Sequence, residues 1–183
     1  MSMNPKVRAN LAVDSSLIAH QGVIASLAMK SIYKFECYDS EGNLKWVEEV
    51  QNLVTNEGLN DLLSKYLKGS SYTAAFYVGL KNTGTPLAAD TLASHSGWTE
   101  NSTYTGNRQA LTLGSVASQS VDNSASKASF AITGSTTIYG AFLATVASGT
   151  SGVLYGAADF GASRAVISGD TLNVTVTLTA ASA

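Results

Sequence analysis

Alternation between apolar and polar side chains in residues 172–179 is the feature that most limits how this chain can fold. Leucine and valine occupy the even positions of this stretch, and asparagine or threonine the odd ones. Successive side chains of a β-strand point to opposite faces, so the segment predicts a strand with one buried face and one face in water. A mainly β fold follows if the rest of the chain shows the same alternation of apolar and polar residues.

Several other segments show strand-like alternation. Residues 30–39 and 44–51 flank a turn in which Gly42 and Asn43 can take positive φ, which predicts a hairpin. Repeated short strands with turn residues between them are typical of an antiparallel β-sandwich or jelly roll. Further strands are predicted approximately at residues 75–80, 98–104, 109–113, 125–132, 137–145, 152–157 and 164–167.

One segment, residues 56–68, has the period of a helix instead. From Leu59 onward, apolar residues recur at i, i+3, i+4, i+7 and i+8, which is the stripe of an amphipathic helix. Thr55 or Asn56 can cap the first turn, and Gly69 follows where a C-terminal cap belongs. The predicted fold is therefore mainly β with one amphipathic helix.

The first 28 residues show no regular period, and Pro5 indicates an extended arm. Their apolar content is too high for a solvated tail. We interpret residues 1–28 as an N-terminal arm and residues 29–183 as the sandwich domain. An arm that docks on a neighbour and a strand or short helix packed on its own domain both fit. The candidate contact residues for a capsid or another subunit are Lys6, Arg8, Leu11, Val13, Leu17, Ile18, Val23 and Ile24.

Charge is scarce and uneven. Charged residues make up 13% of the chain, against about a quarter in average proteins, and the formal net charge is −2. Residues 1–68 hold 15 of the 24 charged side chains. Lysine and arginine are scattered singly, which argues against direct nucleic-acid binding. No apolar run reaches the length of a membrane span or has the layout of a signal peptide, so we expect synthesis in the cytoplasm and no membrane contact.

No set of residues predicts catalysis, a metal or a cofactor. The single cysteine and two histidines, Cys37, His20 and His95, are too few for a structural zinc site. Phosphate-binding glycine loops and nucleophile motifs are missing from the sequence. We therefore expect a protein that is not an enzyme.

Residues 90–100 combine a histidine, a tryptophan and two acids. A functional interpretation pairs His95 with Asp90 or Glu100 as a catalytic centre or a ligand pocket. A structural interpretation has Trp98 closing the end of the sandwich and His95 bonded to the backbone. We favour the structural interpretation because no nucleophile accompanies the histidine.

The remaining conspicuous residues have simple structural interpretations. Glu48 and Glu49 are neighbours on a predicted strand, so they should point to opposite faces and not share a proton. Cys37 is predicted to be a small, half-buried core residue. Arg108 and Arg164 are rare charges in the neutral part of the chain. Solvation at the surface is expected for both, with an interchain salt bridge as the alternative.

Taken together, several segments resemble small virion proteins of tailed bacteriophages, in particular head decoration, or cement, proteins. The resemblance implies a β-sandwich or jelly-roll body, usually a homo-oligomer and often a trimer. It also implies a position on the outer capsid surface, the major capsid protein as partner, and no catalytic residue. The segments that carry it are residues 13–19, 33–49, 52–63, 76–80, 93–100, 140–143 and 168–174.

Three functions were weighed. A cement protein fits the low-charge β body and the apolar arm. A tail or head fibre module would recognise host surface glycans through exposed aromatic residues such as Trp98, Tyr104 or Tyr139. A virion hydrolase would have to be centred on His95. The cement function is the one we expect.

Overall fold

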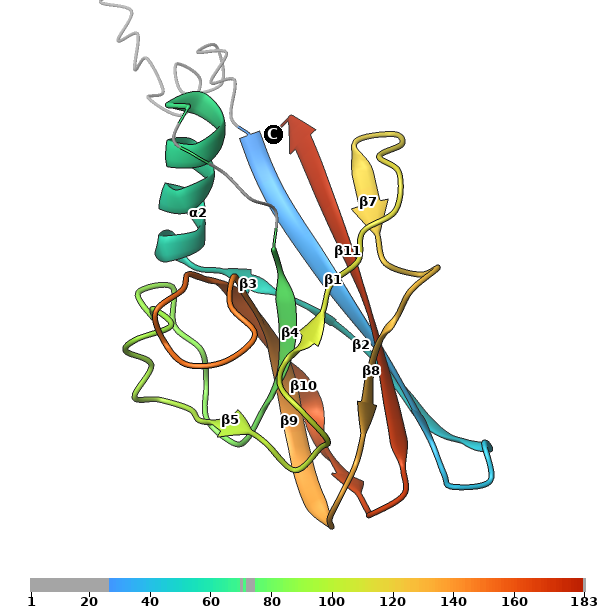
Figure 1. Ribbon diagram of the computed structural model, residues 1–183. Coiled ribbons are helices and arrows are strands. Elements are labelled where there is room, and N and C mark those ends of the chain that lie inside the picture. The colour runs from blue at the N-terminus through green and yellow to red at the C-terminus, as the bar shows by residue number, and fades with distance from the viewer. Residues whose placement is uncertain (1–26, 70, 72–74, 183) are drawn as a thin grey trace, which may run out of the picture.

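A computed structural model describes residues 27–69, 71 and 75–182 of the chain. It shows two packed antiparallel sheets with one helical segment at one end, which confirms the predicted β-sandwich with a single helix (Figure 1). The eight candidate contact residues of the arm, from Lys6 to Ile24, lie outside the described residues. Leu27 and Ala28 already belong to the first strand.

The first sheet, here called sheet A, is built around two long strands that pair along their whole lengths. Strand β1 pairs with β11 through 12 residue pairs, from Leu27 opposite Ser182 to Tyr38 opposite Thr171. The sheet has the order β2-β1-β11-β7, and β8 also pairs with β11. Its strands are β1 (Leu27–Tyr38), β2 (Leu44–Gln51), β7 (Ser120–Asp122), β8 (Ala128–Ala131) and β11 (Thr171–Ser182).

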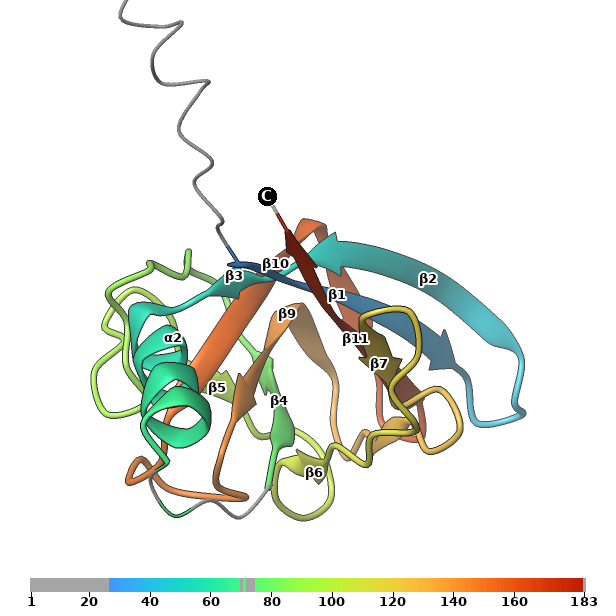
Figure 2. The ribbon, with the colours of Figure 1, turned by 90° about the horizontal axis from the view of Figure 1, so that it is seen from above.

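The second sheet, sheet B, has the order β3-β10-β9-β4-β5, and β6 also pairs with β4. Seen from above, the helix lies at one side of the sandwich and hairpin β1–β2 reaches out at the other (Figure 2). The strands of sheet B are β3 (Leu53–Val54), β4 (Tyr77–Lys81), β5 (Glu100–Asn101), β6 (Gln109–Ala110), β9 (Thr136–Ala144) and β10 (Leu154–Val166).

The predicted hairpin is confirmed in detail. Its turn is closed by Asp39, whose backbone N–H donates to the carbonyl of Asn43 at 2.9 Å and whose Oδ1 accepts from the N–H of Asn43 at 2.8 Å. Gly42 takes a φ of +84°, as the turn chemistry predicts. The turn fixes the register in which the inward residues of β2 meet those of β1.

Other strand predictions need correction. The strands predicted at 152–157 and 164–167 merge into one strand, β10 (Leu154–Val166). An irregularity of register between Asp159 and Arg164 carries the strand through the interruption, and Phe160 stays in the core. The segments predicted at 98–104 and 109–113 shrink to the two-residue strands β5 and β6. Strands β3 and β7 were not predicted, since two or three residues show no periodicity.

The helix begins as predicted but ends differently. The side chain of Thr55 accepts a hydrogen bond from the N–H of Gly58 at 3.1 Å, which confirms it as the N-terminal cap. The α-helix α2 (Asn56–Leu62) continues as a π-helical turn, η1 (Leu63–Leu67), and Gly69 follows with a φ of +75°. The amphipathic pattern predicts that the apolar stripe packs on the body, but its outer part is exposed.

The main core lies between the two sheets. Alternate residues of β1 and β11 enter it from sheet A, and residues of β4, β9 and β10 from sheet B. Aromatic rings meet edge to face across it, with Phe35 and Phe160 at 4.5 Å between ring centroids. Cys37 belongs to this core and is fully buried, rather than half-buried as predicted.

A second core covers the outer face of sheet B. The chain after β4 folds back over that face, and Trp98 packs there on Phe142 with ring centroids 5.2 Å apart. Sheet B is therefore covered on both faces, by sheet A and by residues 82–99. The second core consists of Leu92, Trp98, Phe142, Ala144, Leu154 and Ala157.

Glycine at position 79 makes room for the ring of Phe142. The two residues are paired across β4 and β9, and a Cβ at Gly79 would overlap the ring. The ring has little freedom to move, because Trp98 lies on it and the guanidinium of Arg108 lies 5.0 Å from its centroid. We therefore expect Gly79→Ala to lower the free energy of unfolding by about 1–3 kcal/mol, measured by urea denaturation.

Gly161→Ala is the matched control. A Cβ at this exposed position meets only the carboxylate of Glu48, at 3.8 Å. Its stability should stay within about 0.5 kcal/mol of the parent protein. Equal stabilities for the two variants would contradict the role assigned to Gly79.

Candidate functional site

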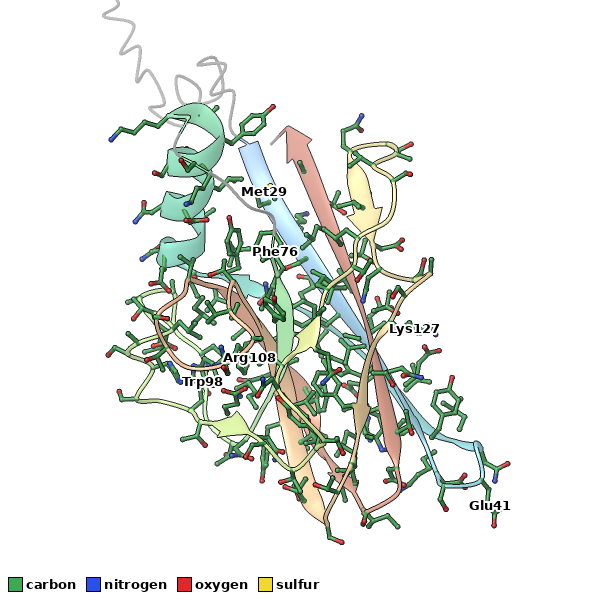
Figure 3. The ribbon with its side chains drawn as sticks, viewed as in Figure 1. Met29, Glu41, Phe76, Trp98, Arg108 and Lys127 are labelled. Atoms are coloured by element: carbon green, nitrogen blue, oxygen red, sulfur yellow. The ribbon has the colours of Figure 1, made fainter. Side chains whose placement is uncertain are left out.

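The histidine of the 90–100 segment is held in a structural arrangement. Its ring stacks on that of Trp98, with centroids 4.2 Å apart, and its Nδ1 lies 3.0 Å from the carbonyl oxygen of Thr91. Because a carbonyl only accepts, Nδ1 carries the proton in this contact. Trp98 is buried, with 3% of its surface exposed (Figure 3). The predicted bond from His95 to the backbone is confirmed, but Trp98 covers the outer face of sheet B rather than closing the end of the sandwich, because it packs on Phe142 of β9.

The two acids of the segment bond to other partners. Oδ2 of Asp90 accepts from the indole N–H of Trp98 and from the backbone N–H of Leu87, both at 2.9 Å. Glu100 holds Arg108 through two hydrogen bonds. The pairing of His95 with Asp90 or Glu100 that a catalytic centre would need is therefore not assembled.

Surface solvation is wrong for Arg108, which is 6% exposed. Its Nε and Nη2 donate to the two carboxylate oxygens of Glu100 at 3.0 and 2.8 Å, and Nη1 donates to the carbonyl of Val146 at 3.0 Å. Such a two-pronged bond suits the planar guanidinium and fixes its orientation. Arg108 thus ties β5 to the loop after β9.

A buried lysine that the sequence analysis did not single out also joins separate segments of the chain. Lys81 is fully buried, forms an ion pair with Asp159 and donates to the carbonyl of Gly84 at 2.5 Å. Position 140 of β9 lies between the lysine and the aspartate in the register of the sheet, and it is a glycine. The pattern apolar-apolar-lysine at the end of a strand gives no sign of this contact, because the partner lies 78 positions away.

Glu48 and Arg164 also make structural contacts within the domain. Glu48 binds Arg164 through an ion pair, and Arg164 also lies 5.9 Å from the ring centroid of Trp46. Surface solvation is therefore incomplete for Arg164 as well. Glu48 is half-buried while Glu49 is exposed, which fits the predicted opposite faces.

The buried thiol at position 37 lies beside a carboxylate. Its Sγ is 3.9 Å from Oδ2 of Asp170, which also accepts from the ammonium of Lys45 at 2.5 Å. Burial, followed by the charge of Asp170, raises the pKa of the Cys37 thiol to about 11. The thiol is therefore protonated and unreactive at neutral pH.

The outer face of sheet A is not covered by another layer among the described residues. Because Leu172, Val174, Val176 and Leu178 point into the core, the alternate residues of β11 point outward. They form an uncharged row in the middle of the sheet, here called the threonine row. Its members are Thr171, Asn173, Thr175, Thr177 and Thr179.

Three charged residues beside the threonine row are joined in ion pairs and together leave a net charge of +1. Glu36 of β1 forms ion pairs with Lys34, at 3.3 Å, and with Lys127 before β8. The hydrogen bond from Lys127, helped by Lys34, holds the pKa of Glu36 below its ordinary value of 4.5. The same contact raises the pKa of Lys127. Two lysines and one glutamate thus form one connected group beside an uncharged strand.

Comparisons with protein families, curated proteins and solved structures found no match for this chain. Among the described residues, no group of three or more histidine, cysteine, aspartate or glutamate side chains is arranged to hold a metal ion. The described helical segment is too short to cross a bilayer. We take the threonine row and its charged neighbours as the candidate functional site, because they lie on a sheet face that no other layer of the described residues covers.

Removing the carboxylate of Asp90 should destabilise the protein. In Asp90→Ala the indole N–H of Trp98 and the N–H of Leu87 lose their acceptor in a buried place. We expect the free energy of unfolding to fall by about 1–3 kcal/mol in urea titrations. Ser96→Ala, an exposed change in the same loop, should stay within about 0.5 kcal/mol. An Asp90→Ala protein as stable as its parent would rule out this anchor.

The ion pairs of Glu36 predict a pH dependence of stability. The pKa of Glu36 is lowered in the folded protein, so its ionised form stabilises the fold above its ordinary value of 4.5. That contribution is lost as the pH falls through the lowered pKa. Glu36→Gln should therefore be less stable than the parent near neutral pH, and the difference should shrink as the pH falls below 4.5 and through the lowered pKa. A difference that does not change with pH over this range would contradict the prediction.

Proposed function

We propose that this chain is a non-enzymatic virion protein of a tailed bacteriophage, a decoration or cement protein that binds the outer capsid surface and stabilises the head. The observation that carries the proposal is the outer face of sheet A. It carries the uncharged threonine row with a connected group of ion pairs beside it, on a body whose other sheet is covered on both sides. Such a face is suited to lie against another protein.

The physical argument concerns the cost of removing water. The cores of protein interfaces are depleted in lysine, glutamate and aspartate, because unpaired charges are costly to desolvate. The threonine row contains none of these residues, and Glu36 already has its partners. A specific interface buries on the order of 1,600 Å² in total, which an extended sheet face is well placed to supply.

The proposed partners are the major capsid protein and further copies of this chain, in a homo-oligomer whose expected form is a trimer. The protein would be made in the host cytoplasm and act on the virion, without direct contact to nucleic acid or membrane. The resemblance of segments such as residues 52–63 and 168–174 to phage head proteins points the same way. The N-terminal arm is the second proposed contact.

The alternative, a fibre module that recognises glycans, has less support. It requires exposed aromatic side chains, yet Trp98 is 3% exposed and Tyr104 is 6% exposed. Tyr139 is half-buried in β9. Sugar rings stack on accessible aromatic faces, and two of the three candidates offer none.

The proposal is tested by placing charge on the threonine row. The double variant Thr175→Arg/Thr177→Arg puts two guanidinium groups on the proposed interface, without touching the core side of β11. We expect binding to heads of the parent phage, measured by co-sedimentation, to weaken by about 100-fold or more, since burying unpaired charges costs several kcal/mol. Circular dichroism should confirm that the fold is retained.

Thr150→Arg, in the exposed loop between β9 and β10, is the matched control and should bind like the parent protein. Unchanged binding by the folded double variant would refute the threonine row as the contact. Binding of the parent protein to host cells but not to heads would refute the cement function and favour the fibre module.

A further inference from the structure

An apolar cleft opens at the end of the sandwich where β1 begins. It lies between that strand, the helix and β10, and it encloses about 60 Å³. Met29 and Phe76, from β1 and from the segment before β4, lie on its two sides (Figure 3). Here we call it the end cleft. Its aliphatic and phenylalanine lining residues are Met29, Val54, Leu59, Leu62, Phe76, Leu143 and Leu178.

The apolar surface continues out of the end cleft along the helix. Leu59 at the margin is 39% exposed and Leu63, one turn on, is 52% exposed. Tyr66 and Leu67 are exposed to 82% and 72%. Large apolar side chains grouped in this way mark a surface that another segment covers. The helix is thus only half covered by the described body.

The position of the chain itself identifies the covering segment. Strand β1 starts at Leu27, and Figure 1 shows this start at the same end of the molecule as the last turn of the helix. Met29, two residues later, already lines the end cleft. Twenty-six residues precede Leu27, and their second half contains the apolar residues Leu17, Ile18, Val23 and Ile24.

We propose that residues 17–24 of the same chain cover the end cleft and the exposed face of the helix. Ile24 lies three positions before Leu27, so it can reach no farther than about 10 Å from the start of β1. A tether this short gives an effective concentration of about millimolar, which the arm of an unassembled copy at micromolar concentration does not match. The tether also keeps the chain's own arm beside the end cleft whether or not the protein assembles with further copies. The occupant is therefore the chain's own arm rather than the arm of another copy.

This assignment divides the arm into two parts. Residues 17–24 belong to the body, and the earlier contact residues Lys6, Arg8, Leu11 and Val13 remain for a partner. The inference does not depend on the proposed function, because it concerns the isolated protein. A failure of capsid binding and a failure of arm docking are separate results.

The test is a disulfide between the arm and the helix in the full-length chain. Ile24→Cys is combined with Leu63→Cys, and the double variant is oxidised mildly at micromolar concentration. The native Cys37 can stay, since it is buried and its pKa is raised to about 11. We expect an intramolecular disulfide, seen as a monomer of altered mobility on a non-reducing gel and unaffected by dilution.

The matched control replaces Leu63→Cys with Leu44→Cys. Leu44 is 55% exposed, nearly as Leu63 is, but it lies beyond the far end of β1. Twelve strand residues span on the order of 40 Å, which Ile24 cannot bridge. This pair should not form the intramolecular disulfide. A disulfide-linked dimer of the Leu63 pair, which would identify a second copy as the occupant, overturns the proposal.

A second measurement keeps the proposal testable if the two cysteines lie close together but their geometry prevents a disulfide from forming. Alkylation of Leu63→Cys alone is followed in the full-length chain, with Leu17, Ile18, Val23 and Ile24 either native or all replaced by serine. We expect the serine version to react about tenfold faster, a factor that matches a docking equilibrium of at least ten to one. The rate at Leu44→Cys should not change. Equal rates at Leu63→Cys in the two versions would show that the arm leaves the helix uncovered.

Discussion

The pairing of β1 with β11 is the constraint on which the rest of this molecule depends. Its register, unbroken over 12 residue pairs, decides which side chains of sheet A enter the core and which face outward. Shifting the register by one residue would place the threonine row in the core and the valines in water. The interior and the proposed contact surface are therefore two sides of one hydrogen-bonded ladder.

The two sheets use their outer faces differently. Sheet B carries Trp98 and the loop around it on its outer face, and two buried cations fasten this cover. Lys81 reaches Asp159, and Arg108 reaches Glu100. Buried ion pairs contribute little net stability but are costly to break, so they favour one arrangement of the loop over others. The outer face of sheet A has no such cover among the described residues, and Glu36 there is paired with Lys34 and Lys127.

The sequence predicted those parts of the structure that local patterns encode. The alternation in residues 172–179, the turn at Gly42 and the cap at Thr55 all rest on neighbouring residues, and all three are confirmed. The bond from His95 to the backbone was also predicted, whereas the position of Trp98 on the outer face of sheet B was not, because its partner Phe142 lies far away in the sequence.

The sequence could not predict contacts that join distant positions. Arg108 and Lys81 gain their partners only when strands are placed side by side, and no local pattern shows this. The irregularity of register after Asp159 joined two predicted strands, and Phe160 packs inward despite the glycine beside it. The exposure of Tyr66 and Leu67 was missed for a similar reason, since an apolar stripe indicates a surface to be covered but not what covers it. The arm's contact residues remain a prediction.

The same ladder also dictates an order of events during synthesis. Cys37 and Asp170, which meet at its end, are 133 positions apart, so β1 leaves the ribosome well before its partner exists. At about 5–20 residues per second, hairpin β1–β2 waits several seconds with one edge of β1 unpaired. Pairing of strands over such a separation is slow. Until it occurs, the unpaired edge of β1 can pair with another chain. Each copy of the chain is thus produced through an intermediate that is open at its central strand.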